Sequence, residues 1–152
     1  VQRLRGQALL VRGCRQAADR RGQRRDQPLR PREVAAEPVL QADLADLGDV
    51  ASASCEVVLA AHTIDRVDDL GRLLRQVHRI LKPGMPLVLS MPHPYADISP
   101  EHPYGTGART IGEWFTALTR ANFRIDQLHE LGATAHSPAP AALVLRARKE
   151  GS

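Results

Sequence analysis

Residues 55–92, CEVVLAAHTIDRVDDLGRLLRQVHRILKPGMPLVLSMP, decide the fold of this chain. The run EVVLAA is short, apolar and rich in β-branched residues, which is typical of a buried strand. Asp65, Asp68 and Asp69 follow, and then apolar residues recur at intervals of three and four, which predicts a helix with one apolar face. Those apolar residues are Leu70, Leu73, Leu74, Val77, Ile80 and Leu81. The Lys-Pro-Gly sequence at 82–84 ends the helix, and PLVLSMP is a second apolar strand.

Two strands joined by one helix of this length are expected to lie parallel in a sheet, with the helix packed across it. In such sheets ligands bind where the strands end and the loops begin. The two strands of this unit are followed by His62-Thr63 and by His93-Pro94-Tyr95. We therefore expect the functional site near these residues.

The composition is that of an ordinary globular domain. The chain has 152 residues, of which 43% are hydrophobic and 25% charged. No apolar run approaches the roughly 20 residues that cross a bilayer, and the apolar run QALLV is too short for a secretory signal. We expect a cytoplasmic protein that does not bind membranes. Its two cysteines, Cys14 and Cys55, have no metal-ligand spacing and are predicted to be reduced thiols.

Charge is distributed unevenly along the chain. Residues 1–32 hold ten arginines and two aspartates, a net charge of +8, whereas the remainder holds 11 basic and 15 acidic residues, a net charge of −4. A basic arm on an acidic body suggests nucleic-acid binding. However, this arm has no lysine and no aromatic residue for base stacking. We rank a nucleic-acid-binding module last among the functions considered.

The remaining segments complete an α/β pattern. A short strand is expected at Val39–Ala42, before a loop with acidic residues. Residues 93–108 form a loop long enough to be a functional lid or a mobile segment. A helix follows, with Thr110 as its N-cap and Glu113 at the capping-box spacing. Two further strands, FRIDQLHEL and AALVLRARK, are joined by a turn-rich connector that lets them pair antiparallel. The predicted fold is a mostly parallel sheet with one reversed strand at its end.

At this point the residues resemble a known family. From about Arg32 to Lys149 the chain is similar to the C-terminal two-thirds of a class I S-adenosylmethionine-dependent methyltransferase, with a Rossmann-like fold. Four segments carry the resemblance in the family's order: QADL at 41–44, CEVVLAAHTIDRVDD at 55–69, LLRQVHRILKPGMPLVLS at 73–90 and RTIGEWFTALTRANFRI at 109–125. Met85 replaces the second glycine of the family's Leu-Lys-Pro-Gly-Gly. Asn122 replaces the glycine of its Ala-Gly-Phe, a mild change because asparagine tolerates positive φ.

The resemblance implies a transferase that uses S-adenosylmethionine as its cofactor and methylates a small molecule. On the cofactor side it implies contacts from Asp43, Leu44, Ala61 and His62. Residues on the long loop are expected to line the pocket for the methyl acceptor, and these are His93, Tyr95, His102 and Tyr104. His62 is also the candidate general base, because an unperturbed imidazole titrates near neutral pH; the alternative is that it only shapes the pocket, as residues at this position more often do. The paired His-Pro-Tyr triplets of the loop invite a metal site, but no cysteine completes a ligand set and we expect no metal.

The family's glycine-rich turn after the first strand is missing. The only candidate is LLVRGC at 9–14, where Gly13 has no glycine partner at the required spacing. We therefore divide the chain into an arginine-rich, divergent or disordered segment at 1–32 and a methyltransferase-like domain at 33–152, with the N-terminal part of the fold incomplete or divergent. The chain is an enzyme if its cofactor site is intact. The alternative is a non-catalytic remnant of the fold that no longer binds cofactor.

The missing segment also bears on self-association. If residues 7–12 do not complete the sheet, the strand at 56–61 becomes an exposed apolar edge. On that ground we expect a homo-oligomer or poor solubility.

Overall fold

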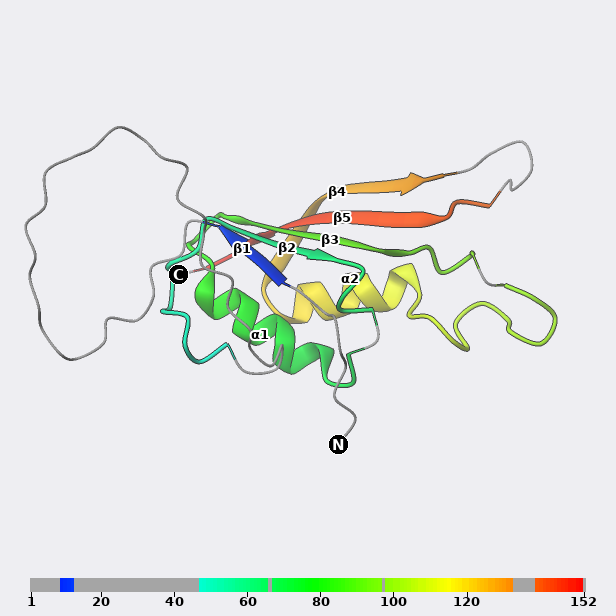
Figure 1. Ribbon diagram of the computed structural model, residues 1–152, viewed down its shortest axis with the longest axis horizontal. Coiled ribbons are helices and arrows are strands. Elements are labelled where there is room, and N and C mark those ends of the chain that lie inside the picture. Colours follow the sequence, from blue (N-terminus) through cyan, green and yellow to red (C-terminus); the bar gives the residue numbers. More distant parts are fainter. Residues whose placement is uncertain (1–8, 13–46, 66, 97, 133–138, 152) are drawn as a thin grey trace, which may run out of the picture.

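In the part of the chain that the structure describes, five strands form one sheet, and two helices cover one of its faces (Figure 1). The structure is a computed structural model, and it describes residues 9–12, 47–65, 67–96, 98–132 and 139–151. The elements are β1 (Leu9–Arg12), β2 (Val57–Ala61), α1 (Leu70–Ile80), β3 (Pro86–Pro92), α2 (Ile111–Arg120), β4 (Phe123–Leu131) and β5 (Ala142–Lys149).

The strand–helix–strand unit predicted from residues 55–92 is confirmed. β2 and β3 pair parallel, in a register that runs from Val58 opposite Leu87 to Ala61 opposite Ser90. The side chain of Asp69 caps α1 by accepting a hydrogen bond from the backbone N–H of Arg72. The apolar stripe is buried against the sheet, at Leu70, Leu73, Leu74, Val77 and Ile80.

The strand order is β1-β2-β3-β5-β4. β5 runs antiparallel to both of its neighbours, β3 and β4, so that β2, β3 and β4 share one direction. The prediction of one reversed strand at the end of the chain is therefore confirmed. In space this strand lies between β3 and β4 rather than at the border of the sheet.

β1 fills the position beside β2, but it runs antiparallel to it. Leu9 lies opposite Ala60, and Arg12 lies opposite Val57. The exposed β2 edge on which the oligomer expectation depended is thus paired, and self-association stays a prediction without that support. The carboxyl end of β1 lies at the amino end of β2, which is the opposite border of the sheet from the residues that follow β2 and β3.

Two irregular positions in the sequence have a local explanation. Asn122, between α2 and β4, has a φ of 58°, as its place in the family's glycine position predicts. β4 contains a bulge between Ile125 and Gln127, and after it Leu128 lies opposite the buried Leu145. The bulge accounts for the break in the alternation of apolar residues along FRIDQLHEL.

The prediction of reduced thiols is wrong for Cys55, which is fully buried and disulfide-bonded. Spacing along the sequence does not report which cysteines the fold brings together. Disulfides are rare in reducing compartments, and the cytoplasmic location stays a prediction.

The strand expected at Val39–Ala42 lies outside the described residues, as does most of the arm at 1–32 on which the nucleic-acid alternative depends. No helix in the described part of the chain is long and apolar enough to cross a membrane.

Candidate functional site

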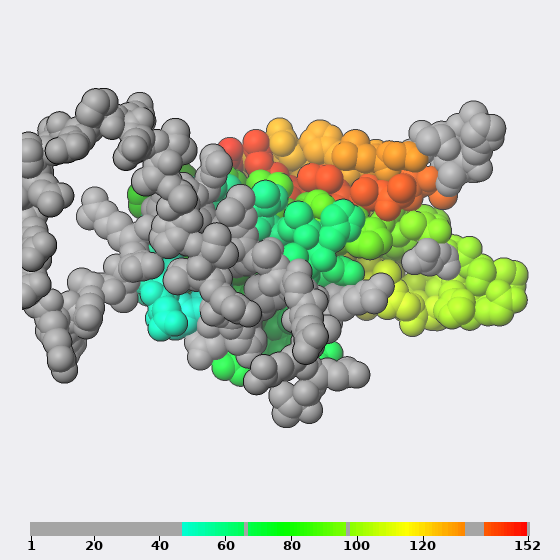
Figure 2. Space-filling model, viewed as in Figure 1, coloured from blue at the N-terminus to red at the C-terminus, as the bar shows by residue number. Residues whose placement is uncertain are grey.

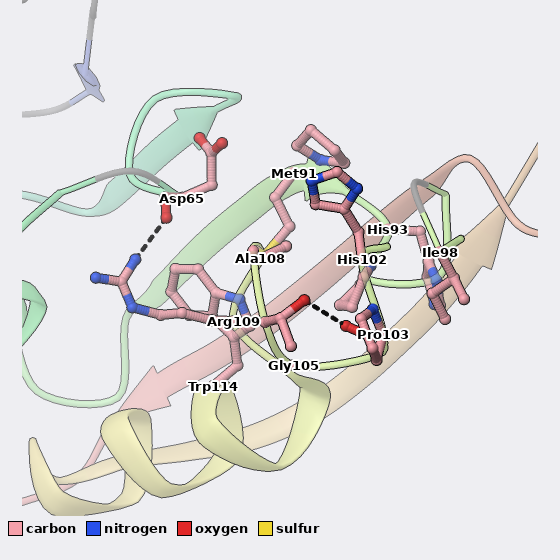
Figure 3. A pocket seen from close by; sticks show the side chains of 14 residues that line it. Asp65, Met91, His93, Ile98, His102, Pro103, Gly105, Ala108, Arg109 and Trp114 are labelled. Carbon is pink, nitrogen blue, oxygen red and sulfur yellow. Dashed lines mark hydrogen bonds between the residues drawn. The ribbon is translucent and has the colours of Figure 1, made fainter. Parts of the chain in front are cut away.

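A cavity of about 470 Å³ opens beyond the carboxyl end of β3 (Figure 3). It lies between the loop after β2, the long loop that follows β3, and the first turns of α2. Its lining consists of Asp65, Met91, Pro92, His93, Pro94, Ile98, His102, Pro103, Gly105, Thr106, Gly107, Ala108, Arg109 and Trp114. Figure 2 shows the yellow-green long loop at one end of the molecule, beside the orange and red strands β4 and β5.

His93 forms a fixed part of the cavity wall. It is 2% exposed, and its Nε2 lies 2.9 Å from Oε1 of Glu130 on β4. Its Nδ1 accepts a hydrogen bond from the backbone N–H of Tyr95 at 3.1 Å. Because Nδ1 is an acceptor, the proton of the neutral ring is on Nε2, which donates to the Glu130 carboxylate. Both ring nitrogens are therefore engaged, and His93 holds the wall in place rather than transferring protons.

Three of the predicted acceptor-site rings stack on one another. The rings of His93 and Tyr95 are 5.6 Å apart at 24°, and those of Tyr95 and Tyr104 are 4.7 Å apart at 23°. The Tyr104 hydroxyl accepts a hydrogen bond from the backbone N–H of Ile111, the first residue of α2. The stack thus connects β3, the long loop and α2. Tyr95 and Tyr104 themselves support the wall and do not line the cavity.

His102 lines the cavity with fewer constraints. Its backbone N–H donates to Oγ of Ser99, and its Nδ1 is 3.4 Å from the same oxygen. Among the described residues, its Nε2 has no hydrogen-bond partner. Of the two histidines in the lining, His102 is therefore the one with a nitrogen left for a ligand.

Arg109, which is not among the predicted site residues, joins two loops of the site. Its Nη1 and Nη2 donate to the backbone carbonyls of Asp65 and Val67, in the loop after β2. Its guanidinium also lies over the ring of Trp114, 5.9 Å from the ring centroid (Figure 3). The only signal in the sequence is the position of Arg109 directly before the N-cap of α2.

The predicted capping box fixes the start of α2. The Thr110 hydroxyl accepts from the backbone N–H of Glu113, and the Glu113 carboxylate accepts from the backbone N–H of Thr110. That backbone hydrogen bond lowers the pKa of Glu113 below its usual value. One residue further along, Trp114 is 1% exposed and contributes to both the core and the cavity.

The residues predicted on the cofactor side are described only in part. Ala61 and His62 are exposed at the carboxyl end of β2, and His62 has a φ of 51° and donates its backbone N–H to Ser90. His62 does not line the cavity. Asp43 and Leu44 lie outside the described residues.

The residues of the predicted cofactor side that the structure describes are compatible with a bound cofactor. The exposed methyl side chain of Ala61 leaves the strand end open. The adjacent Thr63 has a buried hydroxyl without a partner in the described residues, and a buried polar atom of this kind can serve a ligand. No group of three or more His, Cys, Asp and Glu side chains that could hold a metal ion occurs in the described ranges.

Comparison with known proteins gives consistent results. The family model described as a methyltransferase domain matches residues 12–89, a range that begins inside the segment expected to be divergent. A crystal structure of an S-adenosylmethionine-dependent methyltransferase from Mesorhizobium loti is 24% identical, with a TM-score of 0.61, over 76% of this chain and 73% of that one. One from Methanosarcina mazei is 20% identical, with a TM-score of 0.55, over 73% and 66%. No curated protein matches the sequence.

The same fold also carries a different activity. The [4+2]-cyclase SpnF is 15% identical to this chain, with a TM-score of 0.55, over 73% of this chain and 55% of that one. Likeness at this level shows the fold, and the reaction must be argued from the site.

Proposed function

Because this chain belongs to the class I S-adenosylmethionine-dependent methyltransferases, we propose that it transfers a methyl group from S-adenosylmethionine to a small molecule. The observation that carries this proposal is the cavity beyond β3, on the same border of the sheet as Ala61 and His62. Its volume of about 470 Å³ lies in the range of small-molecule sites. An acceptor held there faces the strand end at which the cofactor is predicted to bind.

S-adenosylmethionine supplies an activated methyl group when bound, so the protein is required mainly to align the acceptor and exclude water. Met91, Ile98 and Trp114 provide the apolar part of the cavity. His102 can hydrogen-bond the acceptor or accept its proton through Nε2. On the cofactor side we assign Asp43, Leu44, Ala61 and His62.

Titration calorimetry with S-adenosylhomocysteine, the demethylated product, tests the cofactor site. We expect saturable binding, weakened about tenfold in Asp43→Ala through the loss of one charge-assisted hydrogen bond. Asp49→Ala, which changes an exposed aspartate outside the cavity lining, serves as the matched control and is expected to bind normally. Transfer of radiolabelled methyl groups from S-adenosylmethionine to a panel of small hydroxyl, amine and carboxylate compounds then tests the acceptor class.

The direction of β1 favours a second candidate, the non-catalytic remnant. In the family the first strand ends in the glycine-rich turn, and here the carboxyl end of β1 lies beside Val57, away from Ala61 and His62. A cooperative thermal melt without S-adenosylhomocysteine binding would identify the remnant. Measurable binding that Asp43→Ala weakens would exclude it.

A further inference from the structure

The guanidinium of Arg109 contacts both the loop after β2 and the cavity. Arg109 donates to the carbonyls of Asp65 and Val67, and the backbone N–H of Val67 donates in turn to the carbonyl of Ile64. Ile64 and the preceding Thr63 are both buried, at 2% and 5% exposed. The carbonyls that Arg109 holds therefore closely follow the buried pair Thr63 and Ile64 in the loop after β2.

The other side of the guanidinium contacts the cavity. Arg109 lines it and lies over Trp114, which lines it as well (Figure 3). A planar guanidinium can donate to two carbonyls and stack on an indole in one conformation, whereas a lysine ammonium is a point charge that cannot do all three. The contacts thus depend on arginine specifically and not on positive charge alone.

We propose that Arg109 is a positioning residue that sets the cavity relative to the loop after β2. Resting on the proposed function, this means that Arg109 transmits cofactor binding near His62 to Trp114 and the acceptor cavity. It predicts that the cofactor side can still bind its ligand when Arg109 is replaced, while the cavity no longer responds.

The chain offers its own reporter and a matched control. Trp114 is the only tryptophan, so tryptophan fluorescence reports on this one side chain in the cavity wall. Arg79, in the last turn of α1, also donates to two backbone carbonyls, those of Val50 and Leu47, at 2.8 and 2.7 Å. These carbonyls precede β2 and lie away from the cavity. Arg79→Lys therefore makes the same chemical change at an arginine that binds two backbone carbonyls outside the site.

The first experiment needs no ligand. Acrylamide quenching of Trp114 is compared among the wild type, Arg109→Lys and Arg79→Lys, with thermal melts to show that each is folded. We expect quenching to rise severalfold in Arg109→Lys and to stay at the wild-type level in Arg79→Lys. Arg109→Gln, whose amide can still donate to one carbonyl, is the second variant if the lysine protein does not fold.

The second experiment uses S-adenosylhomocysteine as the probe. In the wild type its binding is expected to shift Trp114 emission. In Arg109→Lys the calorimetric affinity is expected to stay within about threefold of the wild type, because the cofactor-side residues remain folded. The emission shift is expected to be lost, because the cavity wall at Trp114 is no longer held in position relative to the loop after β2. Arg79→Lys is expected to keep both affinity and shift.

Three outcomes would overturn the inference: an emission shift that survives in Arg109→Lys, the same loss in Arg79→Lys, or unchanged acrylamide quenching. Absence of S-adenosylhomocysteine binding to the wild type is a different result, since it refutes the proposed function. In that case the quenching comparison alone decides whether Arg109 positions the cavity wall at Trp114.

Discussion

Replacing Arg79 by methionine tests how the segment before β2 is held. Arg79 donates to the carbonyls of Leu47 and Val50, and its Nε donates to the Gln76 side chain at 3.1 Å. Leu47 and Val50 belong to the core, at 5% and 4% exposed. Methionine keeps most of the apolar stem of arginine but removes the guanidinium donor from both carbonyls, of which that of Leu47 keeps a hydrogen bond from the backbone N–H of Val50 at 3.0 Å.

The expected loss follows from these contacts. A hydrogen bond to a charged group contributes about 1.5–3 kcal/mol, and the lower value applies here because the site is only partly buried and water can reach the carbonyls. Two such bonds give about 3 kcal/mol in the free energy of unfolding. For a domain of this size that corresponds to a decrease in Tm of about 6–12 °C.

Urea and thermal denaturation, followed by circular dichroism, measure this loss. Arg75→Met is the matched control, because Arg75 is exposed on the same helix one turn earlier, and its effect is expected to stay within about 0.5 kcal/mol. A loss below about 1 kcal/mol in Arg79→Met, or equal losses in the two variants, would refute the reasoning about the carbonyls.

Three further changes have defined outcomes. Hydrogen bonds from Arg146, then from Arg148, lower the pKa of Asp126 from 3.8 to about 2. This carboxylate stabilises the fold above pH 3.8 and loses that contribution as the pH falls towards 2, so Asp126→Asn should flatten the acid limb of a urea-stability profile. Asn122→Ala should lower the free energy of unfolding by about 1 kcal/mol and Asn122→Gly should not, because only the alanine is strained at positive φ; equal effects would contradict this. Thr110→Ala should cost about 1 kcal/mol in chemical denaturation through the lost cap, whereas Thr110→Ser should be close to the wild type.

The fold was predictable where a local pattern repeats. Spacings of three and four residues located α1, and Lys-Pro-Gly located its end, because these features act within one element. The capping box of α2 and the positive φ of Asn122 were predictable for the same reason. The reversed direction of β1 was not, because four residues carry no signal of which way they pair.

The site was predictable only in part. His93 and His102 belong to the loop that follows a parallel strand, and this position predicted that they would lie near a binding site, since loops at strand ends meet on one border of the sheet. Both line the cavity. The partners Glu130 and Arg109 could not be foreseen, because each acts through a contact more than 30 residues away in sequence. Arg109 in addition binds backbone carbonyls, which every residue carries and which leave no trace in the sequence.

The orientation of β1 decides how the proposed function should be weighed. A set of parallel strands brings all of its carboxyl ends to one border, and β2 and β3 do so at His62 and His93. β1 runs the other way, so its carboxyl end cannot contribute backbone contacts to a cofactor at that border. Within the described residues, the proposed cofactor side therefore consists of the end of β2 and the loop that follows it. The Arg109 contacts hold the far end of that loop, at Asp65 and Val67, so we expect their loss to affect the cavity more than the proposed cofactor side at Ala61 and His62.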